Sequence, residues 1–135
     1  MAGILIDTSV LIDAERDRRV LEQLPSDVGY SISVITVSEL LHGVHRATPE
    51  QLRIRRQVVV EALLAAIEQL PITPRIARVH AQIWAGLQAK GRLIGAHDLW
   101  ISATALAHGL TLASANVSEF ERVPALDVLP VVPTG

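Results

Sequence analysis

Three acidic residues, far apart in the chain, stand beside apolar stretches. Asp7 directly follows the apolar run at residues 3–6, Glu39 lies in the helix expected after a second apolar run, and Asp98 lies in the first turn of a later helix. A carboxylate next to a buried strand is unfavourable unless a cation or a set of hydrogen-bond donors receives it. In open α/β sheets, the carboxyl ends of strands and the first turns of the following helices meet at one ligand-binding edge. We therefore expect the three carboxylates to share a cleft.

Three carboxylates in one cleft would raise one another's pKa and destabilise the empty site, unless a divalent cation screens them. Hard oxygen ligands without cysteine suit Mg²⁺, with Mn²⁺ as a possible substitute. Each acid also has a purely structural explanation. Glu39 can complete a capping box with Thr36, and the negative charge of Asp98 can interact favourably with the dipole at the N-terminus of its helix. The conjunction of all three, rather than any one of them, indicates a metal site.

A fourth corner of this cleft is expected in the segment ASANVSEF, which follows the third expected strand. Asn116 would present either an amide oxygen or an amide donor at the rim. Glu119, one helical turn later, would supply an outer carboxylate, acting through water. The structural alternative is a turn residue followed by a surface glutamate.

The elements that must position these residues alternate along the chain. Strands are expected at 3–6, 30–35 and 110–113, with an edge strand at 128–132. Helices are expected after Thr8, after Thr36, at 49–70, at 74–91 and at 96–108, where Gly109 would form the C-cap. Repeated strand-then-helix order predicts an α/β fold with a mostly parallel central sheet and helices on both faces.

Length and composition indicate a single domain at residues 1–135. Half of the 135 residues are hydrophobic, yet the aromatic residues are only two Trp, one Tyr and one Phe. The absence of cysteine excludes thiol catalysis, zinc–cysteine sites and a disulfide scaffold. The first residues lack the basic and long apolar regions of a signal peptide, and no apolar run approaches the roughly 20 residues of a membrane-spanning helix. We expect a soluble cytoplasmic protein that does not enter a membrane.

The net charge of −2 provides no overall attraction for nucleic acid. Arginines nevertheless cluster locally, at residues 16, 18 and 19 and at residues 53, 55 and 56. Such clusters can be solvated surface, or they can contact phosphate groups or the acidic surface of a partner.

The histidines and glycines argue against other enzyme classes. His80 falls on an apolar helix stripe, which is typical of a core histidine, whereas His97 precedes Asp98 and is expected to border the cleft. No serine or cysteine nucleophile motif accompanies a histidine. The chain also lacks the glycine-rich phosphate loop of nucleotide-binding α/β domains.

Four segments together resemble the PIN-domain ribonucleases, and within them the VapC-type toxins of bacterial toxin–antitoxin pairs. These segments are ILIDTSVLID, VITVSELLHGV, IGAHDLWISATALAHGLTLAS and ANVSEFERV. The resemblance implies a three-layer fold and a magnesium-dependent endoribonuclease with its acidic cluster at Asp7, Glu39 and Asp98. It places the hydroxyl of Thr8 near the metal. It also implies a VapB-like antitoxin as partner, a homodimer and a toxin–antitoxin hetero-oligomer.

The chain departs from the family at the last corner. Where the family often has an aspartate, this sequence has Asn116 and the longer Glu119. A second hypothesis is therefore a catalytically degenerate PIN domain that acts as an RNA- or protein-binding module.

Overall fold

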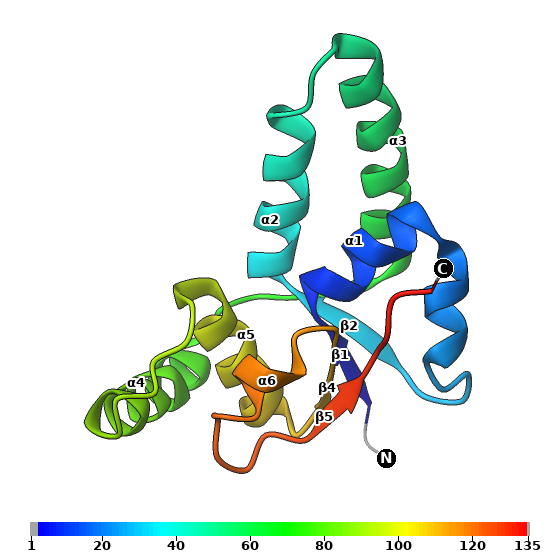
Figure 1. Ribbon diagram of the computed structural model, residues 1–135. Coiled ribbons are helices and arrows are strands. Elements are labelled where there is room, and N and C mark those ends of the chain that lie inside the picture. The colour runs from blue at the N-terminus through cyan, green and yellow to red at the C-terminus, as the bar shows by residue number, and fades with distance from the viewer. Residues whose placement is uncertain (1–2, 135) are drawn as a thin grey trace.

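The computed structural model describes residues 3–134 and arranges them around one sheet (Figure 1). Met1, Ala2 and Gly135, which the predicted domain at 1–135 includes, lie outside the described residues. The sheet order is β3-β2-β1-β4-β5, and each pair of neighbouring strands is parallel. The strands are β1 (Ile4–Ile6), β2 (Tyr30–Ser33), β3 (Glu68–Leu70), β4 (Thr111–Ser114) and β5 (Val128–Pro130). The predicted parallel α/β architecture is confirmed.

Helices follow most strands and cover both faces of the sheet. They are α1 (Thr8–Arg16), the 3-10 helix η1 (Arg18–Gln23), α2 (Val34–His45), α3 (Glu50–Ala66), α4 (Pro74–Ala89), α5 (Ala96–His108) and α6 (Val117–Phe120). In Figure 1, α2 and α3 stand side by side as a helical hairpin on one side of the sheet, while α4 and α5 lie on the other. Within residues 3–134, no helix is both long and apolar enough to cross a membrane.

The alternation of side chains along β1 explains the two helical layers. Ile4 and Ile6 are buried in a core with α1, α2 and α3, whereas Leu5 belongs to a core that includes Ile101 of α5 and Phe120 of α6. Successive residues of a strand point to opposite faces of a sheet, so three apolar residues in a row are buried by both layers. A third core packs α4 against the outer side of α5.

The predicted helix at 49–70 is wrong at its C-terminal end. The helix ends at Ala66, and Glu68–Leu70 forms β3, which pairs with β2 in parallel. Leu70 precedes Pro71, whose ring disfavours helical backbone at the residue before it. Leu70 is also buried against the sheet, so pairing with β2 wins over continuation of the helix.

The capping box proposed for Thr36 and Glu39 is wrong as well. The N-cap of α2 is Ser33, whose hydroxyl accepts a hydrogen bond from the backbone N–H of Ile35 at 3.0 Å. The N-cap therefore lies three residues before Thr36, the residue predicted for this position. Thr36 is instead fully buried within the helix. By contrast, the predicted C-cap at Gly109 is confirmed, with φ of 64°, a conformation that glycine adopts without steric cost.

The parallel arrangement brings the carboxyl ends of three strands together. β1 ends before Asp7, β2 ends at the N-cap of α2, and β4 ends at Ser114, shortly before Asn116 begins α6. Because β1 lies between β2 and β4, the helices that start at these ends converge on one edge of the sheet.

Candidate active site

Asp7 is held at the end of β1 by two serine hydroxyls. Its side chain is buried, and Oδ2 accepts hydrogen bonds from Ser9 Oγ at 2.5 Å and from Ser114 Oγ at 2.9 Å. Both hydroxyls are themselves oriented by the turn after β4, since Ala115 N donates to Ser9 Oγ and Asn116 N donates to Ser114 Oγ. Each serine oxygen thus accepts from the backbone and directs its own proton to the same carboxylate oxygen.

Burial dominates the ionisation of Asp7. Removal from water raises its pKa, and the charge of Glu39 raises it further, while the hydrogen bonds from Ser9 and Ser114 oppose the shift. The net direction is upward. A buried carboxylate whose pKa is raised despite two hydroxyl donors gains stability from a nearby cation.

Glu39 is joined to α1 through Thr8. The Thr8 hydroxyl donates to Glu39 Oε1 at 2.8 Å and lies 3.0 Å from Thr36 Oγ1. On the other side, Nδ1 of His97 lies 3.5 Å from Glu39 Oε2. Residues from α1, α2 and the first turn of α5 therefore meet at this carboxylate, and His97 borders the cleft.

Asp98 has the most strongly shifted carboxyl group in the site. Its pKa rises to about 8, because of burial, a hydrogen bond to Glu119, and the charges of Asp7, Glu119 and Glu39. In this pair the pKa of Asp98 rises and that of Glu119 falls. Charges from three other chain segments thus act on Asp98.

Glu119 is the charged member of this pair. Its Oε1 accepts from the backbone N–H of Gly95 at 2.7 Å, and its Oε2 accepts from Nδ2 of Asn116 at 2.6 Å. The hydrogen bond with Asp98 is the largest of several contributions that lower the pKa of Glu119. A Cβ at Gly95 would lie 3.6 Å from both Asp98 Oδ2 and Glu119 Oε1, so the two carboxyl groups converge beside this glycine.

The expected site residues therefore differ in what they contact. Asp7, Glu39 and Glu119 all act electrostatically on Asp98, and Glu39 also acts on Asp7. Thr8 supports Glu39. Asn116 uses its amide as a donor to Glu119, which selects one of the two roles that the sequence left open.

Three hydroxyl residues that hold the acids were not predicted from the sequence. Ser9 and Ser114 support Asp7, and Thr36 approaches Thr8. Ser9 lies two residues after Asp7, a spacing at which a hydroxyl can reach a carboxylate, and this was the available signal. Ser114 and Thr36 had none, because their partners are 107 and 28 residues away.

The donor set suits a hard divalent cation by its chemistry, with oxygen ligands and an excess of negative charge. Among residues 3–134, no three His, Cys, Asp or Glu side chains form a ready-made ligand group. Asp7 and Glu39 instead accept hydrogen bonds from hydroxyl groups, and burial and the neighbouring acids raise the pKa of Asp98. A cation would take the place of a proton on Asp98. It would also screen the repulsion between carboxylates that raises the pKa of Asp98.

Comparison with known proteins places this geometry in a family. The family model described as PIN domain matches residues 4–126. Ribonuclease VapC1 of Rickettsia felis is 36% identical over 129 residues, which cover 96% of each chain.

Solved structures agree on the fold. VapBC2 from Rickettsia felis, bound to a DNA fragment from its promoter, has a TM-score of 0.82 at 23% identity and covers 95% of this chain and 98% of that chain. DNA-bound VapBC from Salmonella typhimurium has a TM-score of 0.81 at 28% identity and covers 96% of this chain and 98% of that chain. With the family model spanning nearly the whole sheet and every acid of the cleft, this chain belongs to the PIN-domain family.

Proposed function

We propose that this protein is a metal-dependent endoribonuclease, the toxin of a bacterial toxin–antitoxin pair, built as a single PIN domain. One observation carries the proposal: acids from four separate segments lie at the carboxyl edge of a parallel sheet, where Asp7, Glu39 and Glu119 all act on Asp98. The relatives named Ribonuclease VapC support RNA as the substrate.

Asp7, Glu39 and Asp98 would hold Mg²⁺, or Mn²⁺ in its place, with Glu119 in the outer shell. When bound, the ion would supply Lewis acidity toward a phosphate oxygen and a lower pKa for water. Ser9 and Ser114 keep Asp7 oriented, while Thr8 keeps Glu39 oriented. These supports hold the carboxylates in place before substrate arrives, which reduces the reorganisation that the reaction requires.

The reaction would be hydrolysis of a phosphodiester. The oxygen of water bonds to phosphorus, the bond from phosphorus to O3′ breaks, and the products carry a 3′-hydroxyl and a 5′-phosphate. Asn116 and the N–H of Gly95 keep Glu119 in place at the rim. Their role is to keep the outer carboxylate from turning into solvent.

An antitoxin is the proposed protein partner, because the solved relatives are VapBC complexes. Apolar side chains on the outer face of α3 support a protein partner: Ile54 is 50% exposed, Val58 66% and Val59 51%. Covering such residues contributes favourable free energy of association. The proposed assembly is a hetero-oligomer of toxin and antitoxin that also contains a toxin homodimer.

Purified protein incubated with a mixed RNA pool and Mg²⁺ tests the enzymatic proposal. We expect cleavage that a chelator stops and that added Mg²⁺ or Mn²⁺ restores. D7N is expected to remove the activity, while D27N, at an exposed site outside the cleft, retains it. Binding of RNA without cleavage by the unmodified protein would instead support the degenerate binding module.

A further inference from the structure

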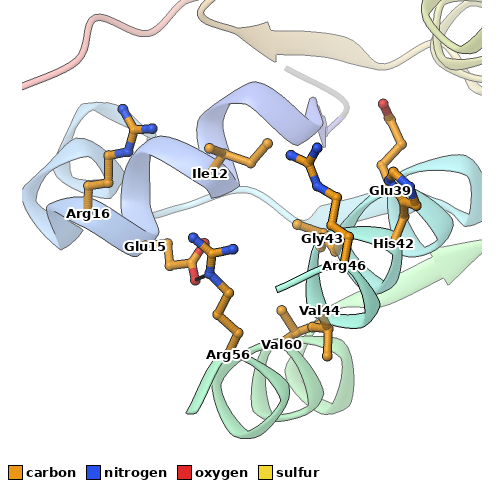
Figure 2. Close-up of a pocket in the computed structure, with 11 residues that line it drawn as sticks. Ile12, Glu15, Arg16, Glu39, His42, Gly43, Val44, Arg46, Arg56 and Val60 are labelled. Atoms are coloured by element: carbon orange, nitrogen blue, oxygen red, sulfur yellow. Dashed lines mark ion pairs between the residues drawn. The ribbon is translucent and has the colours of Figure 1, made fainter. Parts of the chain in front are cut away.

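A groove of about 170 Å³ lies between α1, α2 and α3, beside the carboxylate cleft (Figure 2). Val44 and Val60 are buried at its base, and arginines stand around it. In Figure 2, Arg16 and Glu39 lie on opposite sides of the groove, with the guanidinium of Arg46 between them. Arg16 of α1 and Arg46, the C-cap of α2, therefore both border a groove that Glu39 of the cleft also lines.

Two of the groove's three arginines have no carboxylate partner. Arg56 Nε pairs with Glu15 Oε1 at 3.3 Å, which accounts for the third. Within the described part of the chain, no acidic group lies within 4.0 Å of the side chains of Arg16 or Arg46. Both residues are at helix C-termini, where a cation is favoured by the helix dipole. The dipole explains the residue type, but not why side chains from two different helices line the same groove.

Glu39 connects the groove with the cleft. It lines the groove, and its Oε1 also accepts the hydrogen bond from Thr8 beside Asp7. Its charge acts on both Asp7 and Asp98. Glu39 therefore borders both the cleft and the groove, and the two features adjoin at this side chain.

We infer that this groove holds the RNA strand next to the scissile phosphate, with Arg16 and Arg46 as positioning residues that bind its phosphates. The inference rests on the proposed ribonuclease function and names the residues that retain its substrate. Guanidinium groups offer forked donors that match phosphate oxygens.

The proposed reaction favours RNA over an acidic peptide as the occupant. The chain carries a net charge of −2 and concentrates carboxylates in the cleft, so a polyanion needs a local source of attraction. An acidic peptide can also pair with the arginines, but only RNA carries the phosphodiester on which the proposed cleft acts and continues from it as a strand. An RNA strand satisfies both surfaces, because its neighbouring phosphates meet the arginines while one phosphate reaches the proposed cation site.

The test compares two double variants that lose the same charge. R16A/R46A removes the groove arginines, and R75A/R78A removes two exposed arginines of α4, on the other side of the sheet. Both should show thermal unfolding like that of the unmodified protein, since all four side chains are exposed. Cleavage of a short single-stranded RNA of mixed sequence is then measured over a range of RNA and salt concentrations.

For R16A/R46A we expect KM to rise on the order of tenfold with kcat within about twofold. In a D7N background, which prevents cleavage, the same RNA should bind with a salt slope shallower by about 1.4, since each single-strand phosphate contact contributes about 0.7. R75A/R78A should change neither quantity.

Equal KM and equal salt slope in both double variants would overturn the inference. So would loss of affinity for the antitoxin in R16A/R46A with unchanged RNA binding, which would assign the groove to a protein. Failure of the unmodified protein to cleave RNA would instead refute the proposed function.

Discussion

The carboxyl groups of Asp98 and Glu119 converge beside Gly95, where a Cβ would lie 3.6 Å from Asp98 Oδ2 and from Glu119 Oε1, and their interaction raises the pKa of Asp98 while it lowers that of Glu119. The two residues belong to α5 and α6, which follow different strands. The repulsion between their negative charges, together with the charges of Asp7 and Glu39, opposes the ionisation of Asp98. It also makes the pair the most direct place to test the cation that we propose.

Replacement of Asp98 by Asn should stabilise the metal-free protein while it abolishes cleavage. The pKa of Asp98 rises from 3.8 to about 8 in the folded state, so its contribution to stability is complete below pH 3.8 and is lost as pH rises toward 8. D98N lacks this loss, and its amide can still donate to Glu119. Thermal unfolding with chelator present should show the advantage of D98N growing between pH 5 and pH 8. An advantage independent of pH would contradict the shifted pKa.

Magnesium should stabilise the unmodified protein more at pH 8 than at pH 6, because the cation competes with the proton of Asp98. Ligand that binds only the folded state raises its stability, by about 2.7 kcal/mol at a hundredfold excess over Kd. Thermal unfolding with and without Mg²⁺ at both pH values measures this effect. D98N should show little stabilisation by Mg²⁺ at either pH, whereas D27N should behave like the unmodified protein.

Removal of the Ser114 hydroxyl should weaken both the fold and the site. S114A takes one donor from Asp7 and leaves the N–H of Asn116 without its acceptor, at a cost of about 1–2 kcal/mol in the free energy of unfolding. The affinity for Mg²⁺ should fall by about tenfold, as for other groups that orient metal ligands. Urea unfolding and Mg²⁺ titration of cleavage measure the two effects. S118A, at an exposed serine of α6, is the matched control and should change neither.

The hydroxyl of Thr8 should matter more than its methyl group. T8V removes the donor to Glu39 while keeping the shape of the side chain, and we expect activity to fall by about tenfold or more. T8S retains the hydroxyl and should retain most of the activity. Steady-state kinetics on the same RNA distinguish the two variants. Equal activity of T8V and T8S would show that the bond to Glu39 has no catalytic importance.

Local sequence patterns determined most of the elements and the identity of the acids. Asp7 after an apolar run, Asp98 in a first helical turn and Gly109 as a C-cap all depend on residues a few positions apart. Such signals are properties of the chain itself, because backbone preferences and helix ends involve neighbouring residues. The errors also arose here, since Glu68–Leu70 continues a helical pattern that only pairing with β2 interrupts.

Tertiary structure alone decided how the acids are supported. Thr8 meets Glu39 across 31 residues, and Ser114 meets Asp7 across 107. These contacts exist because β1 lies between β2 and β4 in the sheet. The sequence thus determined which groups could bind a cation or donate a proton. The fold decided which of them meet, because contact between distant residues depends on strand order rather than on spacing along the chain.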